Sequence, residues 1–163
     1  MPSALLIDLD DTLPDDRGAM AKSVLQFREK HGMAAHETDE TLVSRWDEVG
    51  RALWQKLARG EVTFQEQRRV RLRQVFLKNM SDYEADELFA DYLKFYEENW
   101  SLLPGADEFL AATAHLPRVI VTNSHRPQAH RKLEKCGLAR MFNGVVTPED
   151  CGARKPDPKI FTH

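Results

Sequence analysis

The chain has 163 residues, enough for one globular domain with a hydrophobic core. Hydrophobic residues make up 42% of it and charged residues 30%, an ordinary balance for a soluble protein. The formal net charge of −3 argues against a nucleic-acid binder, and no apolar stretch is long enough to cross a membrane. The start lacks the basic flank of a signal peptide, and Cys136 and Cys151 lack metal-ligand spacing. We therefore expect a cytoplasmic protein with reduced cysteines that binds neither nucleic acid nor membranes.

An apolar run that leads directly into carboxylates is the most informative feature near the N-terminus. The aliphatic residues 4–7 predict a short strand, buried on both faces as in a parallel sheet. Asp8, Asp10 and Asp11 follow it, at the strand end where such sheets bind ligands. Two converging carboxylates need a cation such as Mg²⁺ or a shared proton. A helix N-cap is the simpler alternative, but one capping residue would suffice for that.

The segment that follows has a helical pattern. Apolar residues recur at spacings of three and four in several successive stretches. Gly32 and Gly60 end the first two stretches, and capping boxes at Thr63–Glu66 and Ser81–Glu84 begin the next two. The pattern predicts about four helices, typical of a small antiparallel bundle.

Aromatic and basic residues in this segment have structural explanations. Trp46, Trp54 and Trp100 fall at helical spacings, which favours core packing over an aromatic ligand cage. The arginine-rich stretch 68–73 follows Glu61 and Glu66, which favours a solvated helix face over a nucleic-acid site.

Strand character returns after the turn at Pro104-Gly105 and alternates with helices. The predicted elements are, in order, a helix over 106–115 with Phe109 and Leu110 facing inward, a strand at 119–121, a helix between Pro127 and Gly137, a strand at 145–146 and a helix opened by Pro158. This alternation predicts an α/β fold with a parallel sheet. We expect a core domain over 1–13 and 103–163, and an inserted helical cap domain over 14–102. The short last helix and the uncovered sheet edge suggest a C-terminally truncated domain, whose edge offers a surface for a homodimer.

Polar residues stand at or just after the end of each predicted strand. Asp8 and Asp10 follow the first, Thr122 and Asn123 the second, and Lys155 comes after the third. A carboxylate nucleophile, a second carboxylate as acid and base, a hydroxyl and an ammonium suit phosphoryl transfer. The sequence therefore predicts that these side chains gather at one edge of the sheet.

Three motifs resemble those of the haloacid dehalogenase superfamily of hydrolases, in the branch with a helical cap after the first strand. They are Asp8–Leu13, Val121–Ser124 and Arg154–Phe161. The resemblance covers the whole chain and implies a Rossmann-like three-layer core with a four-helix-bundle cap. It also implies that an aspartate two residues beyond the nucleophile marks a phosphatase, since true dehalogenases lack it.

The resemblance implies a role for each candidate site residue. Asp8 would be the nucleophile and Asp10 the general acid and base, with Thr122 and Lys155 completing the catalytic set. Asp11 and Asn123 would bind the substrate, a small phosphorylated metabolite. Mg²⁺ would bind to Asp8 and to the main-chain carbonyl of Asp10. The acidic pair of the family's fourth motif is absent, so we expect weak Mg²⁺ binding and little activity from this form.

Three alternatives remain open. A phospho-acceptor signalling domain also uses acids, a hydroxyl and a lysine at strand ends, but here roughly a hundred residues separate the first two strands, far beyond usual connections. A non-catalytic interaction protein derived from such a hydrolase would pair its open sheet edge with another chain. A glycosyltransferase-like metal site would need a nucleotide-binding region before Asp8, and almost nothing precedes it.

Overall fold

The computed structural model describes residues 3–162, which divide into two compact units. One contains the residues up to Ala19 together with those from Trp100 onward, and the other contains Met20–Asn99. The domain boundaries expected at residues 13–14 and 102–103 lie a few residues from these divisions and stay a prediction. The expected core ends, Met1 and His163, lie outside the described residues. Within residues 3–162, none of the helices combines the length and apolar character that a membrane crossing requires.

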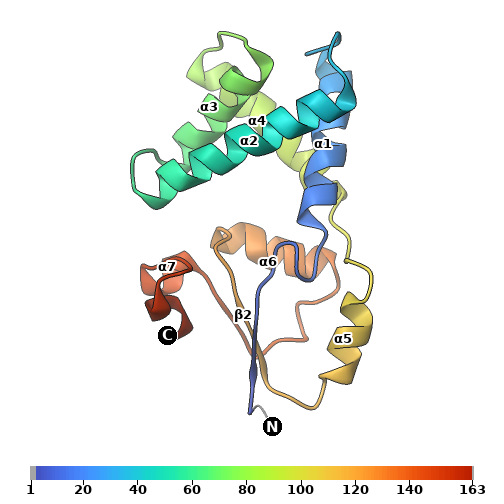
Figure 1. Ribbon diagram of the computed structural model, residues 1–163, viewed down its shortest axis with the longest axis vertical. Helices are drawn as coiled ribbons and strands as arrows, with labels where there is room; N and C mark the ends of the chain where they lie inside the picture. The colour runs from blue at the N-terminus through green and yellow to red at the C-terminus, as the bar shows by residue number, and fades with distance from the viewer. Residues whose placement is uncertain (1–2, 163) are drawn as a thin grey trace. The chain divides into compact units, whose positions relative to one another are not determined.

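A parallel three-stranded sheet forms the centre of the first unit, in the order β1–β2–β3. The strands are β1 (Leu5–Ile7), β2 (Arg118–Val121) and β3 (Gly144–Val146). Ile7 pairs with Ile120 and Val121 with Val146, so the carboxyl ends of the three strands lie at one edge of the sheet. Figure 1 shows β1, in blue, beside β2. The predicted α/β class and parallel sheet are confirmed.

Short helices cover both faces of this sheet and make the three layers. They are α5 (Ala106–Ala112), α6 (Arg126–Lys135), α7 (Pro148–Cys151) and the 3₁₀ helix η1 (Pro158–Phe161). One apolar cluster joins β1 and β2 to α5 and α6 through residues such as Ile7, Leu110, Ile120 and Leu133. A second cluster, Val121, Cys151, Ala153 and Ile160, joins β2 to α7 and η1.

Three predictions for the core are wrong, and one helix was not predicted. Leu6 is 55% exposed, because α7 and η1 pack on β2 and β3 and leave that face of β1 uncovered, so β1 is not buried on both faces. Phe109 is exposed, and only its neighbour Leu110 faces the core. The element opened by Pro158 is a single 3₁₀ turn, not an α-helix. The four-residue α7 was not predicted, because so short a helix has no apolar period to detect.

Helices make up the second unit, as predicted. They are α1 (Asp16–His31), which begins in the first unit, α2 (Asp39–Ala58), α3 (Phe64–Phe76) and α4 (Asp82–Glu98), all labelled in Figure 1. Trp46 is fully buried, and its ring centroid lies 4.5 Å from that of Tyr92. Trp100 is buried in the first unit, so both residues are core, as expected. Trp54, 36% exposed beside Phe64, is a surface residue and corrects the prediction.

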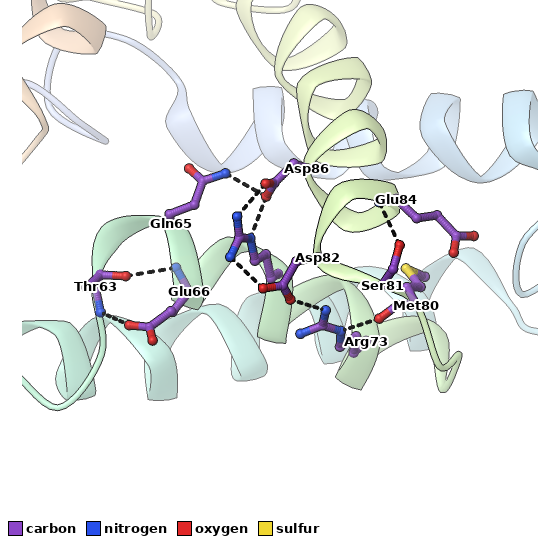
Figure 2. A network of polar contacts seen from close by, with 10 residues as sticks. Thr63, Gln65, Glu66, Arg73, Met80, Ser81, Asp82, Glu84 and Asp86 are labelled. Carbon is purple, nitrogen blue, oxygen red and sulfur yellow. Dashed lines mark hydrogen bonds and ion pairs between the residues drawn. The ribbon is translucent and has the colours of Figure 1, made fainter.

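Polar contacts join the middle and last turn of α3 to the first turns of α4 (Figure 2). The capping box at Thr63–Glu66 is formed in both directions. Ser81 accepts a hydrogen bond from the backbone of Glu84 at 3.2 Å, but the Glu84 carboxylate lies 3.2 Å from Lys78, so only half of the second predicted box is seen.

Two arginines of the stretch 68–73, Arg69 and Arg73, form ion pairs with acids of α4. Arg69 bonds to Asp82 at 2.8 Å and Asp86 at 2.5 Å, and Arg73 bonds to Asp82 at 2.6 Å. These partners come from α4 rather than from the preceding Glu61. These two arginines thus link α3 to α4, and the absence of a nucleic-acid site stays a prediction.

Candidate functional site

The candidate site lies entirely in the first unit, at the carboxyl ends of the strands. Asp8 directly follows β1, and Thr122 directly follows β2. The main-chain amide of Thr122 donates to the carbonyl of Val146 at 3.0 Å, which continues the sheet one residue further. In parallel sheets this edge is where ligands bind.

Asp8 and Lys155 are in direct contact. The Lys155 Nζ lies 2.5 Å from Asp8 Oδ1, and the same oxygen accepts a hydrogen bond of 2.7 Å from the amide of Leu9. The Asp8 side chain is 46% exposed, so it remains accessible to a ligand from solvent. The prediction that these two residues, which are far apart in the sequence, lie at the same edge of the sheet is confirmed by this contact.

Asn123 fixes the backbone that carries Lys155. Its Oδ1 accepts from the Lys155 amide at 2.7 Å, and its Nδ2 donates to the Lys155 carbonyl at 3.1 Å. Arg154 adds a bond of 3.0 Å to the Asn123 carbonyl. The Asn123 side chain thus binds the backbone of Lys155, a contact that was not predicted from the sequence. Its contact with the substrate stays a prediction.

Asp10 is held from two sides. The Ser124 hydroxyl donates to Asp10 Oδ2, and the Lys132 ammonium donates to Asp10 Oδ1. Lys132 also bonds to Asp16 Oδ1 at 2.5 Å. Burial raises the pKa of Asp10 above its ordinary value; the Lys132 ammonium opposes this and the Asp16 charge adds to it, with a net upward direction. Burial lowers the pKa of Lys132, but the two carboxylates more than offset it, so that pKa is also raised.

Thr122 and Asp11 shape the loops around these groups. Thr122 is buried, and its hydroxyl accepts a hydrogen bond of 3.0 Å from the main-chain amide of Ser124, the residue whose hydroxyl donates to Asp10. Asp11 has a φ of 54°, a left-handed conformation that Asp tolerates in tight turns. Its carboxylate accepts from the Arg17 amide at 2.9 Å and pairs with Arg17 Nε at 3.2 Å.

The site offers oxygen ligands for a hard cation, but few of them. Among residues 3–162 there is no cluster of three or more His, Cys, Asp or Glu side chains suited to a metal ion. The half-exposed Asp8 carboxylate fits Mg²⁺, which binds through one or two protein carboxylates and keeps several waters. The residues present therefore fit a weakly held Mg²⁺.

Sequence reasoning gave no role to the residues that surround Asp10: Ser124 and Lys132, which contact it, and Asp16, which contacts Lys132. Ser124 stood within the second motif but was given no role. Lys132 lies in α6 among exposed charged residues, where one buried lysine has no distinguishing pattern. Asp16, the first residue of α1, lies outside the three motifs.

Comparisons with known proteins agree with this fold. A family model described as haloacid dehalogenase-like hydrolase matches residues 2–163. The haloacid dehalogenase-like hydrolase domain-containing protein 3 of Xenopus laevis is 36% identical over 78 residues, which cover 47% of this chain and 31% of that protein. The matched segment is thus about a third of that relative.

Solved structures share the fold over nearly all of the chain. The HAD-hydrolase YfnB of Bacillus subtilis, bound to magnesium, has a TM-score of 0.82 at 24% identity, covering 98% of this chain and 70% of that one. The L-2-haloacid dehalogenase of Xanthobacter autotrophicus has a TM-score of 0.75 at 20% identity, covering 99% and 63%. At such identities the likeness shows the fold alone.

Proposed function

We propose a reaction for this chain, which belongs to the family of haloacid dehalogenase-like hydrolases. It hydrolyses small phosphate monoesters through an aspartyl-phosphate on Asp8. The observation that carries the proposal is the Lys155 ammonium 2.5 Å from the Asp8 carboxylate. It places positive charge where the oxygens of a phosphoryl group on Asp8 would gather. Asp10 supports phosphate over halide chemistry, because a halide leaving group needs no proton.

The proposed reaction has two steps. In the first, an Asp8 oxygen attacks phosphorus, the bond from phosphorus to the ester oxygen breaks, and the carboxyl proton of Asp10 goes to the leaving alcohol. In the second, a water attacks phosphorus, Asp10 takes the proton of that water, and the bond from phosphorus to Asp8 breaks to release phosphate. The raised pKa of Asp10 supports this role, since the group must carry a proton in one step and lose it in the other.

Mg²⁺ is part of the proposal as a weakly held ion on the Asp8 carboxylate and the main-chain carbonyl of Asp10. When bound, it would neutralise charge on the transferring group. Lys155 supplies the other positive charge at this place, and Asn123 keeps the Lys155 backbone in position.

Turnover of p-nitrophenyl phosphate with excess Mg²⁺ tests the proposal. We expect slow hydrolysis that the D8N variant abolishes and that the D10N variant reduces by about 10²-fold or more. An assay of 2-chloropropionate in parallel separates the two chemistries of the fold. Chloride release by the wild type, or phosphate release that D8N leaves unchanged, would overturn the proposed function.

A further inference from the structure

Lys132 is an unusual residue for its position in the fold. It lies in α6 and is fully buried, although lysine is among the residues least often found so. Its ammonium contacts the carboxylates of Asp10 and Asp16 and lies 5.2 Å from the centroid of the Trp100 ring. A buried ammonium is costly unless it is paired, so these contacts are what keep it there.

The contacts of Lys132 and Ser124 leave the Asp10 carboxylate little rotational freedom. Each of its two oxygens has its own donor, the ammonium on Oδ1 and the hydroxyl on Oδ2. The donors come from different segments, because Lys132 belongs to α6 and Ser124 to the loop after β2. Lys132 also separates the like charges of Asp10 and Asp16, which would otherwise repel each other.

We infer that Lys132 is a positioning residue that holds the Asp10 carboxylate in place at the phosphoryl site. It bridges Asp10 to Asp16 and binds the carboxylate oxygen that Ser124 does not bind. The inference rests on the proposed function and deepens it. The two lysines then divide the work: Lys155 acts at the Asp8 carboxylate, and Lys132 acts through Asp10. Displacing a catalytic carboxyl group by about 1 Å can lower the reaction rate about a hundredfold. A residue that holds this group in place therefore affects the rate without touching the substrate.

Three variants test the inference structurally. K132M removes the charge and keeps an unbranched chain. K132M/D16N does the same but preserves the net charge of the cluster, which guards against loss of folding from two unpaired carboxylates. K135M is the control, since Lys135 is exposed on the same helix.

Crystal structures of these variants give a readout that does not depend on activity. In K132M and K132M/D16N we expect the Asp10 carboxylate to leave the Ser124 hydroxyl or to occupy several rotamers, while K135M keeps the original position. An Asp10 carboxylate that stays on Ser124 in the same rotamer in both Lys132 variants would overturn the inference.

Kinetics provide the second readout, with p-nitrophenyl phosphate and excess Mg²⁺. We expect K132M to lower kcat at least about tenfold with KM within about twofold, and to add nothing in the D10N background, because both changes act through one carboxyl group. Multiplying effects in the double variant would contradict the inference. A wild type without Asp8-dependent turnover would instead overturn the proposed function, and the position of Asp10 would still decide the role of Lys132.

Discussion

Two aspartates two residues apart lie in different surroundings. Asp8 is half-exposed and contacts Lys155, whereas Asp10 lies deeper, with Ser124 and Lys132 on its two oxygens. The pKa of Asp10 is raised, chiefly by burial. When two neighbouring carboxyl groups have different environments, one can act as the nucleophile and the other as the general acid and base.

The charge on Lys155 is the first residue-scale prediction. K155M should reduce kcat/KM for p-nitrophenyl phosphate about a hundredfold, because one positive group opposite the developing charge is lost. K159M is the matched control, since Lys159 is exposed in the same segment and should keep wild-type activity. Steady-state kinetics measure kcat/KM for both variants. An equal loss of kcat/KM in K155M and K159M would contradict a specific role of the Lys155 charge and indicate damage to the fold.

At the scale of elements, local signals predicted well where they are strong. The capping box at Thr63 and the glycines that follow α1 and α2 set helix ends through nearest-neighbour contacts, which a sequence displays directly. Leu6 and Phe109 were misjudged because their burial depends on which neighbour covers a face. Because the carboxyl ends of parallel strands meet at one edge, the sequence predicted that Asp8 and Lys155 lie close together. No pattern in the sequence predicts the contact of Lys132, in α6, with Asp10.

The contacts between α3 and α4 predict an acid sensitivity of the helical unit. The Arg73 hydrogen bond lowers the pKa of Asp82, and the Arg69 hydrogen bond lowers that of Asp86. A carboxyl group with a lowered folded pKa stabilises the fold above its unfolded pKa, about 4, and loses that contribution as the pH falls further. Thermal midpoints should therefore drop below about pH 4, and R69M/R73M should show a shallower drop. An unchanged pH dependence in that variant would contradict the assignment.

At the scale of the whole molecule, the site is assembled from three stretches that are distant in sequence. Asp8 to Asp16 run from the end of β1 to the first residue of α1, and Thr122 to Lys132 and Arg154–Lys155 follow the helical unit in the sequence. All lie in one unit, so the chemistry proposed for them depends on that unit.

Mg²⁺ should bind the whole protein weakly and measurably. A ligand that binds only the folded state raises the thermal midpoint according to its concentration relative to its Kd. With the Asp8 carboxylate as the main protein ligand, we expect a rise only at millimolar Mg²⁺ and none in D8N. Matched sodium chloride controls for ionic strength. An equal rise in D8N and wild type would place the ion elsewhere.

The most direct measurement concerns the covalent bond proposed at Asp8. Brief exposure to p-nitrophenyl phosphate with Mg²⁺, followed by borohydride reduction and peptide mass spectrometry, converts an aspartyl-phosphate into homoserine at the labelled position. We predict homoserine at residue 8 in the wild type, more of it in D10N, and none in D8N. Turnover without homoserine at residue 8, or homoserine at another aspartate, would contradict the role of Asp8 as the nucleophile.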